Sequence, residues 1–373
     1  MFAMAKTAFE ISLGLTGILC LWLGIMRIGE RSGFITLLTR GLYPLFQRLM
    51  PEVPKDHPAL GAIVMNMSAN ALGLDNAATP LGIKAMKELQ TLNPEPETAS
   101  DAQILFLVIN TSSVTLFPVT IFAYRAQLGA LHPSDVFIPI LLATYISSIV
   151  GLLAVAFMQK INLFDKIILS YLGGFTLLLS SLLIYFSQLD QASMQQQSAL
   201  LSNTILFSLV ITFMLGAIYY KVNAYEAFID GAKEGFETAK TIIPYLVAML
   251  VAIGVFRASG ALDMGQELVR SAVRYFNVDD RFIDALPTAL MKPFSGSGAR
   301  AMMVETMQTH GADSFSGRMA SIVQGSTETT FYVLAVYFGA VGIKNIRHAA
   351  SCGLIADIGG ITAAIAVSYW FFG

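Results

Sequence analysis

The densest polar stretches of this sequence lie between strongly apolar segments, and they occur twice along the chain. The first pair covers residues 66–80 and 110–115, which are rich in Asn, Ser and Thr, and the second covers residues 292–298 and 324–330. Hydrocarbon offers no hydrogen-bond partner, so such groups inside a bilayer must contact each other, water or a ligand. A polar site at membrane depth built from two copies of one unit is typical of transporters.

The composition predicts that the chain is embedded in a lipid bilayer. Of its 373 residues, 55% are hydrophobic and only 13% are charged, whereas a soluble domain carries about 25% charged residues. The net charge is −2, so we expect no nucleic acid partner. Cys20 and Cys352 both fall in apolar stretches, a pattern that favours buried thiols over a disulfide or a metal site.

Apolar stretches of about 20 residues are needed to cross a bilayer, and eight segments meet this requirement. Two further stretches, 57–87 and 283–308, are too polar and too broken by Gly and Pro to cross as ordinary helices, so we expect re-entrant hairpins there. The amphipathic segments 33–50 and 262–277 are expected to lie in the membrane interface, with an ordinary connecting helix as the alternative. The sequence thus predicts an all-α polytopic membrane protein of about eight transmembrane helices plus two re-entrant helical hairpins. The eight expected spans are 9–28, 102–124, 135–158, 163–187, 201–221, 240–258, 317–341 and 347–371.

Short sequence matches recur in the same order in the two halves of the chain. Gly24-Ile25-Met26-Arg27 is echoed by Gly254-Val255-Phe256-Arg257, and Pro58-Ala59-Leu60 by Pro287-Thr288-Ala289-Leu290. If the hairpins do not cross, five spans precede the second unit, and an odd number inverts it. We therefore expect two inverted-topology repeats, in residues 1–160 and 223–373, joined by connecting transmembrane helices in residues 161–222.

Basic residues predict the orientation of the chain, because cytoplasmic loops carry an excess of Lys and Arg. Leaving out the hairpin regions, one face of the predicted topology takes most of these residues, and the 187–203 loop on the other face has none. We therefore expect a multi-pass protein with both termini outside the cytoplasm.

The polar residues of the hairpins are the first candidates for a substrate site. The residues expected to line the first hairpin, unless they merely cap its helices, are Asn66, Ser68, Asn70, Asn76 and Thr79. Ser295 and Ser297 occupy the matching place in the second hairpin, where Gly296 and Gly298 permit a tight turn or a close approach to a ligand. Arg300 is either a ligand clamp or a partner of Glu305.

The interrupted spans supply the remaining candidates. Glu328 lies in the middle of a long apolar span, where a carboxylate must be paired, protonated or bound to a cation. Carbonyl and hydroxyl oxygens suit a hard cation such as Na⁺, so sodium or a proton is the expected coupling ion, with no cofactor. Asp357 is a second intramembrane carboxylate, for which Lys344, Arg347, His348 or none is the partner. The further substrate-binding candidates are Asn110, Ser112, Ser113, Gln324, Ser326, Thr327 and Glu328, the ion-coupling candidates are Glu328, Thr115, Thr329 and Asp357, and a sodium site is expected near Asn110, Ser113 and Thr329.

These motifs carry a family resemblance. The stretch Asn66–Gly82, followed by Asn110–Thr115, resembles spore maturation protein A, although Asp75 stands where relatives are expected to have a small residue. The stretch Lys292–Ala299, followed by Gln324–Gly339, resembles spore maturation protein B. Both belong to the nucleoside-recognition, or Gate, family, to which the concentrative nucleoside transporters are related. The resemblance covers nearly the whole chain as a fusion of the two, and it implies inverted repeats around one central site and a bacterial cytoplasmic (inner) membrane location.

From the residues and the resemblance together we expect a membrane transporter rather than an enzyme. The predicted function is ion-coupled secondary transport of a small polar solute (a nucleoside, an amino acid or peptide, or a small carboxylate) by alternating access around the central site. The alternative is a non-transporting membrane scaffold or a regulatory subunit of a cell-envelope complex. A homo-oligomer, dimer or trimer, is expected, with spans 135–158 and 163–187 at its interface.

Overall fold

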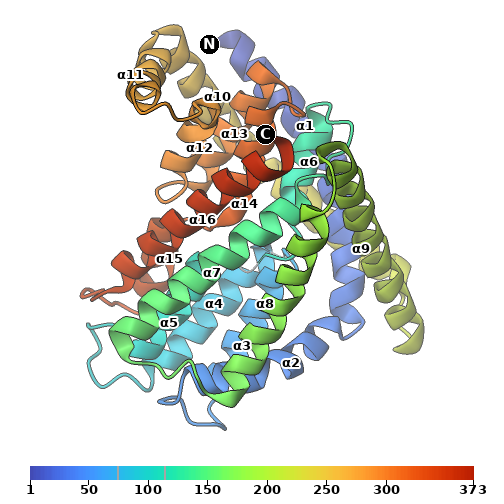
Figure 1. The fold of residues 1–373 in the computed structure, drawn as a ribbon. Helices are drawn as coiled ribbons and strands as arrows, with labels where there is room; N and C mark the ends of the chain where they lie inside the picture. The colour runs from blue at the N-terminus through green and yellow to red at the C-terminus, as the bar shows by residue number, and fades with distance from the viewer. Residues whose placement is uncertain (74, 113–114) are drawn as a thin grey trace.

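The structure, a computed structural model, describes residues 1–73, 75–112 and 115–373, and the side chains of residues 75–77 lie outside this description. Within these ranges the chain is helical throughout, and no element is a β-strand. Both chain ends lie in the upper part of the view in Figure 1. The elements are α1 (Phe2–Arg31), α2 (Phe34–Leu49), α3 (Pro58–Ala71), α4 (Asp75–Gln90), α5 (Asp101–Thr111), α6 (Val119–Gln127), α7 (Phe137–Gln159), α8 (Lys166–Ser187), α9 (Gln191–Tyr219), α10 (Ala224–Ala258), α11 (Ala261–Tyr275), the 3₁₀ turn η1 (Arg281–Ala285), α12 (Leu286–Met291), α13 (Gly296–His310), α14 (Phe315–Ser326), α15 (Thr330–Gly339) and α16 (Ala349–Phe372).

Six of the described helices are long and apolar enough to cross a membrane, namely α1, α7, α8, α9, α10 and α16. Each coincides with one of the eight expected spans. The other two expected spans, 102–124 and 317–341, are broken into α5 plus α6 and α14 plus α15. Both breaks fall where polar residues were expected to interrupt the helix, so the all-helical membrane architecture is confirmed at the level of its long helices.

The order of helices in the first half of the chain recurs in the second half. The series α1, α2, α3–α4, α5–α6, α7 is matched by α10, α11, α12–α13, α14–α15, α16, and α8 and α9 lie between the two series. A glycine with positive φ precedes the amphipathic helix in both halves: Gly33 (75°) before α2 and Gly260 (73°) before α11. These residues follow the serines of the matched Ser-Gly pairs, and glycine permits this left-handed backbone at little cost.

Matched helices pack on each other: α1 runs along α10, and α7 runs along α16. Glycines allow the close approach of α1 and α10. A Cβ atom on Gly231 would lie 2.2 Å from the carbonyl oxygen of Leu23, and one on Gly235 would lie 2.7 Å from that of Leu19. Small residues four apart at a helix contact are typical of membrane helices, which associate by close backbone packing.

Two sequence-based boundaries were wrong. Residues 187–203 were expected to form a loop, but α9 begins at Gln191 because the Asp190 carboxylate accepts a hydrogen bond from the backbone of Ser193 (3.3 Å) and caps the helix. Similarly, α10 begins at Ala224, well before the span expected at 240–258, with Asn223 as its cap. Polar residues therefore continue these helices beyond their apolar segments.

Loops and helix ends of the two halves are joined at two places, which we call the buried clasp and the exposed clasp. In the buried clasp, Arg125 is completely buried and pairs with Asp135 (2.9 Å) and Asp313 (3.0 Å), while Arg318 also contacts Asp135 (2.8 Å). In the exposed clasp, residues 97–101 meet residues 344–347 through backbone hydrogen bonds and the pairs Lys344–Glu97 (2.5 Å) and Arg347–Asp101 (2.8 Å). Each clasp links a segment of the first series of helices to a segment of the second, so the two halves hold each other.

Candidate functional site

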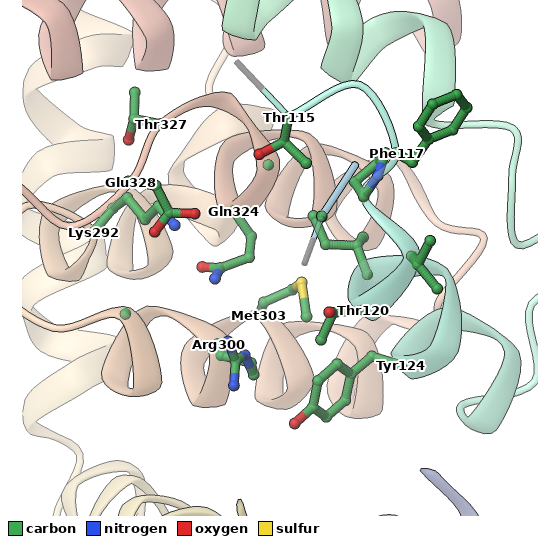
Figure 2. A pocket seen from close by; sticks show the side chains of 16 residues that line it. Thr115, Phe117, Thr120, Tyr124, Lys292, Arg300, Met303, Gln324, Thr327 and Glu328 are labelled. Carbon is green, nitrogen blue, oxygen red and sulfur yellow. The ribbon is translucent and has the colours of Figure 1, made fainter. Parts of the chain in front are cut away.

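Two connected cavities lie between the halves of the molecule. The wide cavity has a volume of about 780 Å³ and the narrow cavity about 100 Å³. Both are lined by Thr120, Gly296, Arg300 and Glu328, which therefore mark the junction between them. Figure 2 shows the narrow cavity, with Thr115, Phe117, Thr120 and Tyr124 of the first half opposite Lys292, Arg300, Gln324 and Glu328 of the second.

The start of α13 forms one wall of the wide cavity. The Ser295 hydroxyl caps the helix by accepting a hydrogen bond from the backbone N–H of Gly298 (3.0 Å), and it lies 3.3 Å from the Ser297 hydroxyl. Gly296 leaves room for the neighbouring interrupted helix, because a Cβ there would lie 2.8 Å from Oγ1 of Thr329. The backbone N–H of Phe331 donates to the Pro293 carbonyl (3.0 Å). These contacts hold the α12–α13 pair against the break between α14 and α15.

Amide side chains from the first half lie on the opposite side of the site. Asn70 donates to Oδ1 of Asn110 (2.8 Å), and the Tyr337 hydroxyl from α15 contacts the same oxygen (3.3 Å). Asn66 is fully buried and donates to the carbonyl of Ala78 (2.7 Å), so it joins α3 to α4. Of these amides, Asn70 and Asn110 line the wide cavity, whereas Asn66 lies behind them.

Glu328 is the most prominent charged group at the junction. Its backbone N–H donates to the carbonyl of Thr111 (2.8 Å), which anchors the break between α14 and α15 on the end of α5. The residue is exposed and lines both cavities, while Thr327 and Thr329 on either side of it are buried. Among the described side chains, no Lys, Arg or His nitrogen lies within 4.0 Å of its carboxylate. The sequence allowed this carboxylate to be paired, protonated or bound to a cation. Among the described residues it forms no ion pair.

Arg300 is the cation at the same junction. Its guanidinium carbon lies 6.0 Å from the ring centre of Tyr124. The sequence left two roles open for Arg300, a ligand clamp or a partner of Glu305. In the structure Glu305 pairs with the guanidinium of Arg257 instead. Lys292, which is buried, is a second basic residue in the narrow cavity.

Gln324 contributes an unsatisfied hydrogen-bond acceptor. Its side chain is 7% exposed and lines the narrow cavity, and its Oε1 atom has no hydrogen-bond partner among the described residues. A buried carbonyl oxygen without a donor is unusual in proteins and costs about 1–3 kcal/mol. In Figure 2, Gln324 lies between Glu328 and Arg300 in the view.

Several candidates from the sequence lie outside both cavities. The hydroxyls of Ser68, Ser112 and Ser326 are buried and donate to carbonyls of their own chain segment, at Val64, Ile109 and Val323. Ser113 lies outside the described residues, as does the side chain of Asn76. The structure thus brings together Asn70, Asn110, Thr115, Ser295, Ser297, Gln324, Thr327, Glu328 and Thr329 at the cavities.

Asp357 lies in α16, away from the cavity surface. It is 1% exposed and accepts a hydrogen bond from the Thr330 hydroxyl (2.6 Å). Lys344 and Arg347, two of the partners considered for it, pair in the exposed clasp instead. The described residues contain no group of three or more His, Cys, Asp or Glu that could hold a metal ion.

Sequence reasoning missed one whole wall of the wide cavity. It is formed by α10, which contributes Glu234, Glu237, Thr238, Thr241 and Tyr245. Most of these residues precede the apolar span expected at 240–258, and the sequence analysis gave them no role. A helix-period count extended through the polar residues from Asn223 onward would have placed Glu234, Thr238 and Thr241 on one helix face.

Comparison with known proteins places the chain in a family. A family model described as Gate, nucleoside recognition, matches residues 12–128 and 239–344. The chain is 45% identical over 175 residues to spore maturation protein B of Bacillus subtilis (strain 168), covering 46% of this chain and 97% of that protein. It is 47% identical over 148 residues to spore maturation protein A of the same strain, covering 40% of this chain and 76% of that protein. No solved structure gives a significant match. The chain therefore belongs to the Gate, or nucleoside-recognition, family, and combines an A-like and a B-like part as in a fusion.

Proposed function

We propose that this membrane protein is an ion-coupled secondary transporter of a small polar solute, and that the connected cavities are its substrate site. The observation that carries the proposal is the junction of the cavities, where Glu328 and Arg300 face open space between the two halves. A volume of about 780 Å³ also falls in the range of about 300–1,000 Å³ that is typical of small-molecule sites.

The repeated helix order supports transport by alternating access. In this proposal the pairs α3–α4 and α12–α13 are re-entrant hairpins, and the two series are inverted-topology repeats in a bacterial inner membrane. Such repeats form sites near the bilayer midplane from broken helices, and rocking of one part against the other exposes the site to each side in turn. Both breaks, at α5–α6 and α14–α15, contribute residues to the narrow cavity.

The coupling ion remains sodium or a proton in this proposal. Thr115, Glu328 and Thr329 lie at the cavities and offer oxygen ligands, as a hard cation requires. Asn110 and Thr329, two of the three residues near which the sodium site is expected, both line the wide cavity. Asp357 is buried nearby in the second half, where it contacts Thr330.

A thermal-shift screen of the purified protein tests the proposal. Nucleosides, amino acids, dipeptides and small carboxylates are compared with and without Na⁺ and at two pH values, because a ligand that binds only the folded state raises the melting temperature. The shift should disappear in Glu328→Gln and persist in Glu226→Gln, whose residue is exposed and lies outside both cavities. A hit is then followed by counterflow uptake into proteoliposomes, and binding without uptake would contradict transport.

Cysteine labelling separates transport from the alternative of a non-transporting scaffold. Cys20 and Cys352 are first replaced by Ala, and single cysteines are placed at Ser297, which lines the wide cavity, and at Ser368, which is buried in α16 outside both cavities. A transporter should react with a membrane-impermeant maleimide at residue 297 and not at 368. Equal protection at both positions would mean that the cavity is sealed and would favour the scaffold.

The expected homo-oligomer and orientation also belong to this proposal. Only 11% of the most apolar window of α8 is buried within the protomer, against 50% for α7, so α8 has the larger surface available for a partner copy. Both termini are proposed to lie outside the cytoplasm, which reporter fusions at each end would test.

A further inference from the structure

We propose that the central site binds a zwitterionic solute, namely a free amino acid or a short peptide with a free ammonium and a free carboxylate group. This inference rests on the proposed function and narrows its substrate class. The structure supports it through two opposite charges that share one junction without pairing with each other.

Glu328 and Arg300 both line both cavities, yet no ion pair within 4.0 Å joins them. Elsewhere in the described chain, charges that approach each other do pair, as in both clasps. Withdrawing a charge from water without a partner is costly. A solute that carries both charges would satisfy Glu328 and Arg300 at the same time.

The surroundings of Glu328 favour a hydrogen-bond donor. The unpartnered Oε1 of Gln324 accepts hydrogen bonds only, so it complements an N–H group. The α10 wall adds Glu234 and Glu237 to the wide cavity, and these two carboxylates already pair with Arg27 (2.8 Å) and Lys240 (3.3 Å). Because Glu234 and Glu237 are paired, the carboxylate of Glu328 and the acceptor oxygen of Gln324 are the groups that attract a cationic donor here, so the solute's ammonium group belongs on this side.

The surroundings of Arg300 favour an anion. Arg300 lies one turn after Gly296, so both residues fall on the same face of α13. Gly296 and Ser297, in the first turn of that helix, line the wide cavity. A helix N-terminus carries a partial positive charge, and a guanidinium can bind a carboxylate through two hydrogen bonds. The solute's carboxylate therefore belongs on this side.

Other solute classes satisfy the junction less well. A neutral nucleoside would displace water from Glu328 and Arg300 without supplying either counter-charge. A simple carboxylate would complement Arg300 and leave Glu328 without a cation. Both would leave a buried charge unpaired in the occupied site, which weakens binding.

Ligand analogues test the two charges on the unmodified protein. Melting temperature and calorimetric affinity are measured for the twenty L-amino acids and Ala-Ala, for their C-terminal amides, for their N-acetyl forms, and for uridine, adenosine and succinate. We expect zwitterions to bind and each capped form to bind at least tenfold more weakly. Because this comparison needs no substitution, it remains decisive if a variant fails to fold.

Variants then assign each charge to its residue. In Arg300→Gln, the zwitterion and its C-terminal amide should bind equally weakly, because the guanidinium that recognises the carboxylate of the zwitterion has been removed. In Glu328→Gln, the zwitterion should lose its advantage over the N-acetyl form. Matched controls are Arg48→Gln and Glu226→Gln, which remove exposed charges outside both cavities and should keep the preference of the original protein.

The outcomes separate this inference from the proposed function. If uridine, adenosine or succinate binds and zwitterions do not, the inference is wrong and the central transport site stands. Equal binding of zwitterions and capped forms would also overturn it. If no solute binds and the cysteine at residue 297 is protected, both the inference and the proposed transport function fail.

Discussion

Replacing Arg125 by Met should be among the most damaging single changes in this protein. Arg125 has no exposed surface, and its guanidinium donates to the carbonyls of Ala312 (2.7 Å) and Pro133 (3.1 Å) as well as to Asp135 and Asp313. Met fills a similar volume but donates none of these hydrogen bonds. The two carbonyls and the carboxylates would then lose a partner in the interior.

The expected magnitude follows from burial. Removing one member of a buried ion pair costs about 3–5 kcal/mol, because the other charge is left uncompensated. Arg318 would still contact Asp135 (2.8 Å), which places the cost toward the lower part of that range. With an unfolding entropy of about 2.1 cal/mol/K per residue for the whole chain, such a cost lowers the melting temperature by about 4–6 °C.

The matched comparison is Lys344→Met in the exposed clasp. Its ion pair with Glu97 is also a contact between the two halves, but the two side chains are 75% and 66% exposed. Exposed pairs contribute about 0–1 kcal/mol, so we expect a shift of about 1 °C or less. Both variants are measured by thermal unfolding in one detergent. Equal shifts for Arg125→Met and Lys344→Met would refute the argument that burial gives the first clasp its strength.

Two other predictions concern packing and pH. Gly235→Leu should separate α1 from α10, because a Cβ at this position would lie 2.7 Å from the α1 backbone. We expect a lower yield of monodisperse protein in size-exclusion chromatography. The control is Gly265→Leu, whose side chain meets open space and should leave the yield unchanged. Hydrogen bonds from Arg281 lower the pKa of Asp279, outside the spans, to about 2. Since the folded pKa lies below the ordinary aspartate value of 3.8, the stabilisation is complete above pH 3.8 and is lost as pH falls toward 2. Melting temperatures between pH 5 and 2.5 should therefore fall less steeply in Asp279→Asn, and identical slopes would contradict this assignment.

The broken spans were predictable from the sequence for a simple physical reason. Polar residues that interrupt an apolar stretch cannot face lipid, so residues 110–115 and 324–330 had to mark breaks or a site. The start of α9 was not predictable in this way, because Gln195, Gln196 and Gln197 give no apolar period. Its helical start depends on the Asp190 cap, which is a local interaction that hydropathy does not detect.

The residue types of the candidate site were predictable from the sequence, but which side chains face the cavities was not. Ser68, Ser112 and Ser326 looked equivalent to Ser295 and Ser297 in the sequence. In the structure the first three donate to carbonyls of their own segment, whereas the last two line the wide cavity. A serine in a helix can satisfy its hydroxyl locally, so sequence alone does not determine whether the group faces a ligand.

Charged residues behave differently, because a backbone carbonyl of the same helix cannot neutralise a carboxylate or a guanidinium. For such residues the decisive question is which of them find a counter-charge. Arg257 takes Glu305, Arg125 takes Asp135 and Asp313, and this leaves Arg300 facing the cavities with Glu328. Only the folded chain shows this result, since Arg257 and Glu305, like Arg125 and Asp313, lie far apart in sequence. A buried charge is stabilised by a counter-charge, which is why the buried clasp contributes stability. For the same reason Glu328 and Arg300, which do not pair with each other, are the best candidates for binding a charged solute.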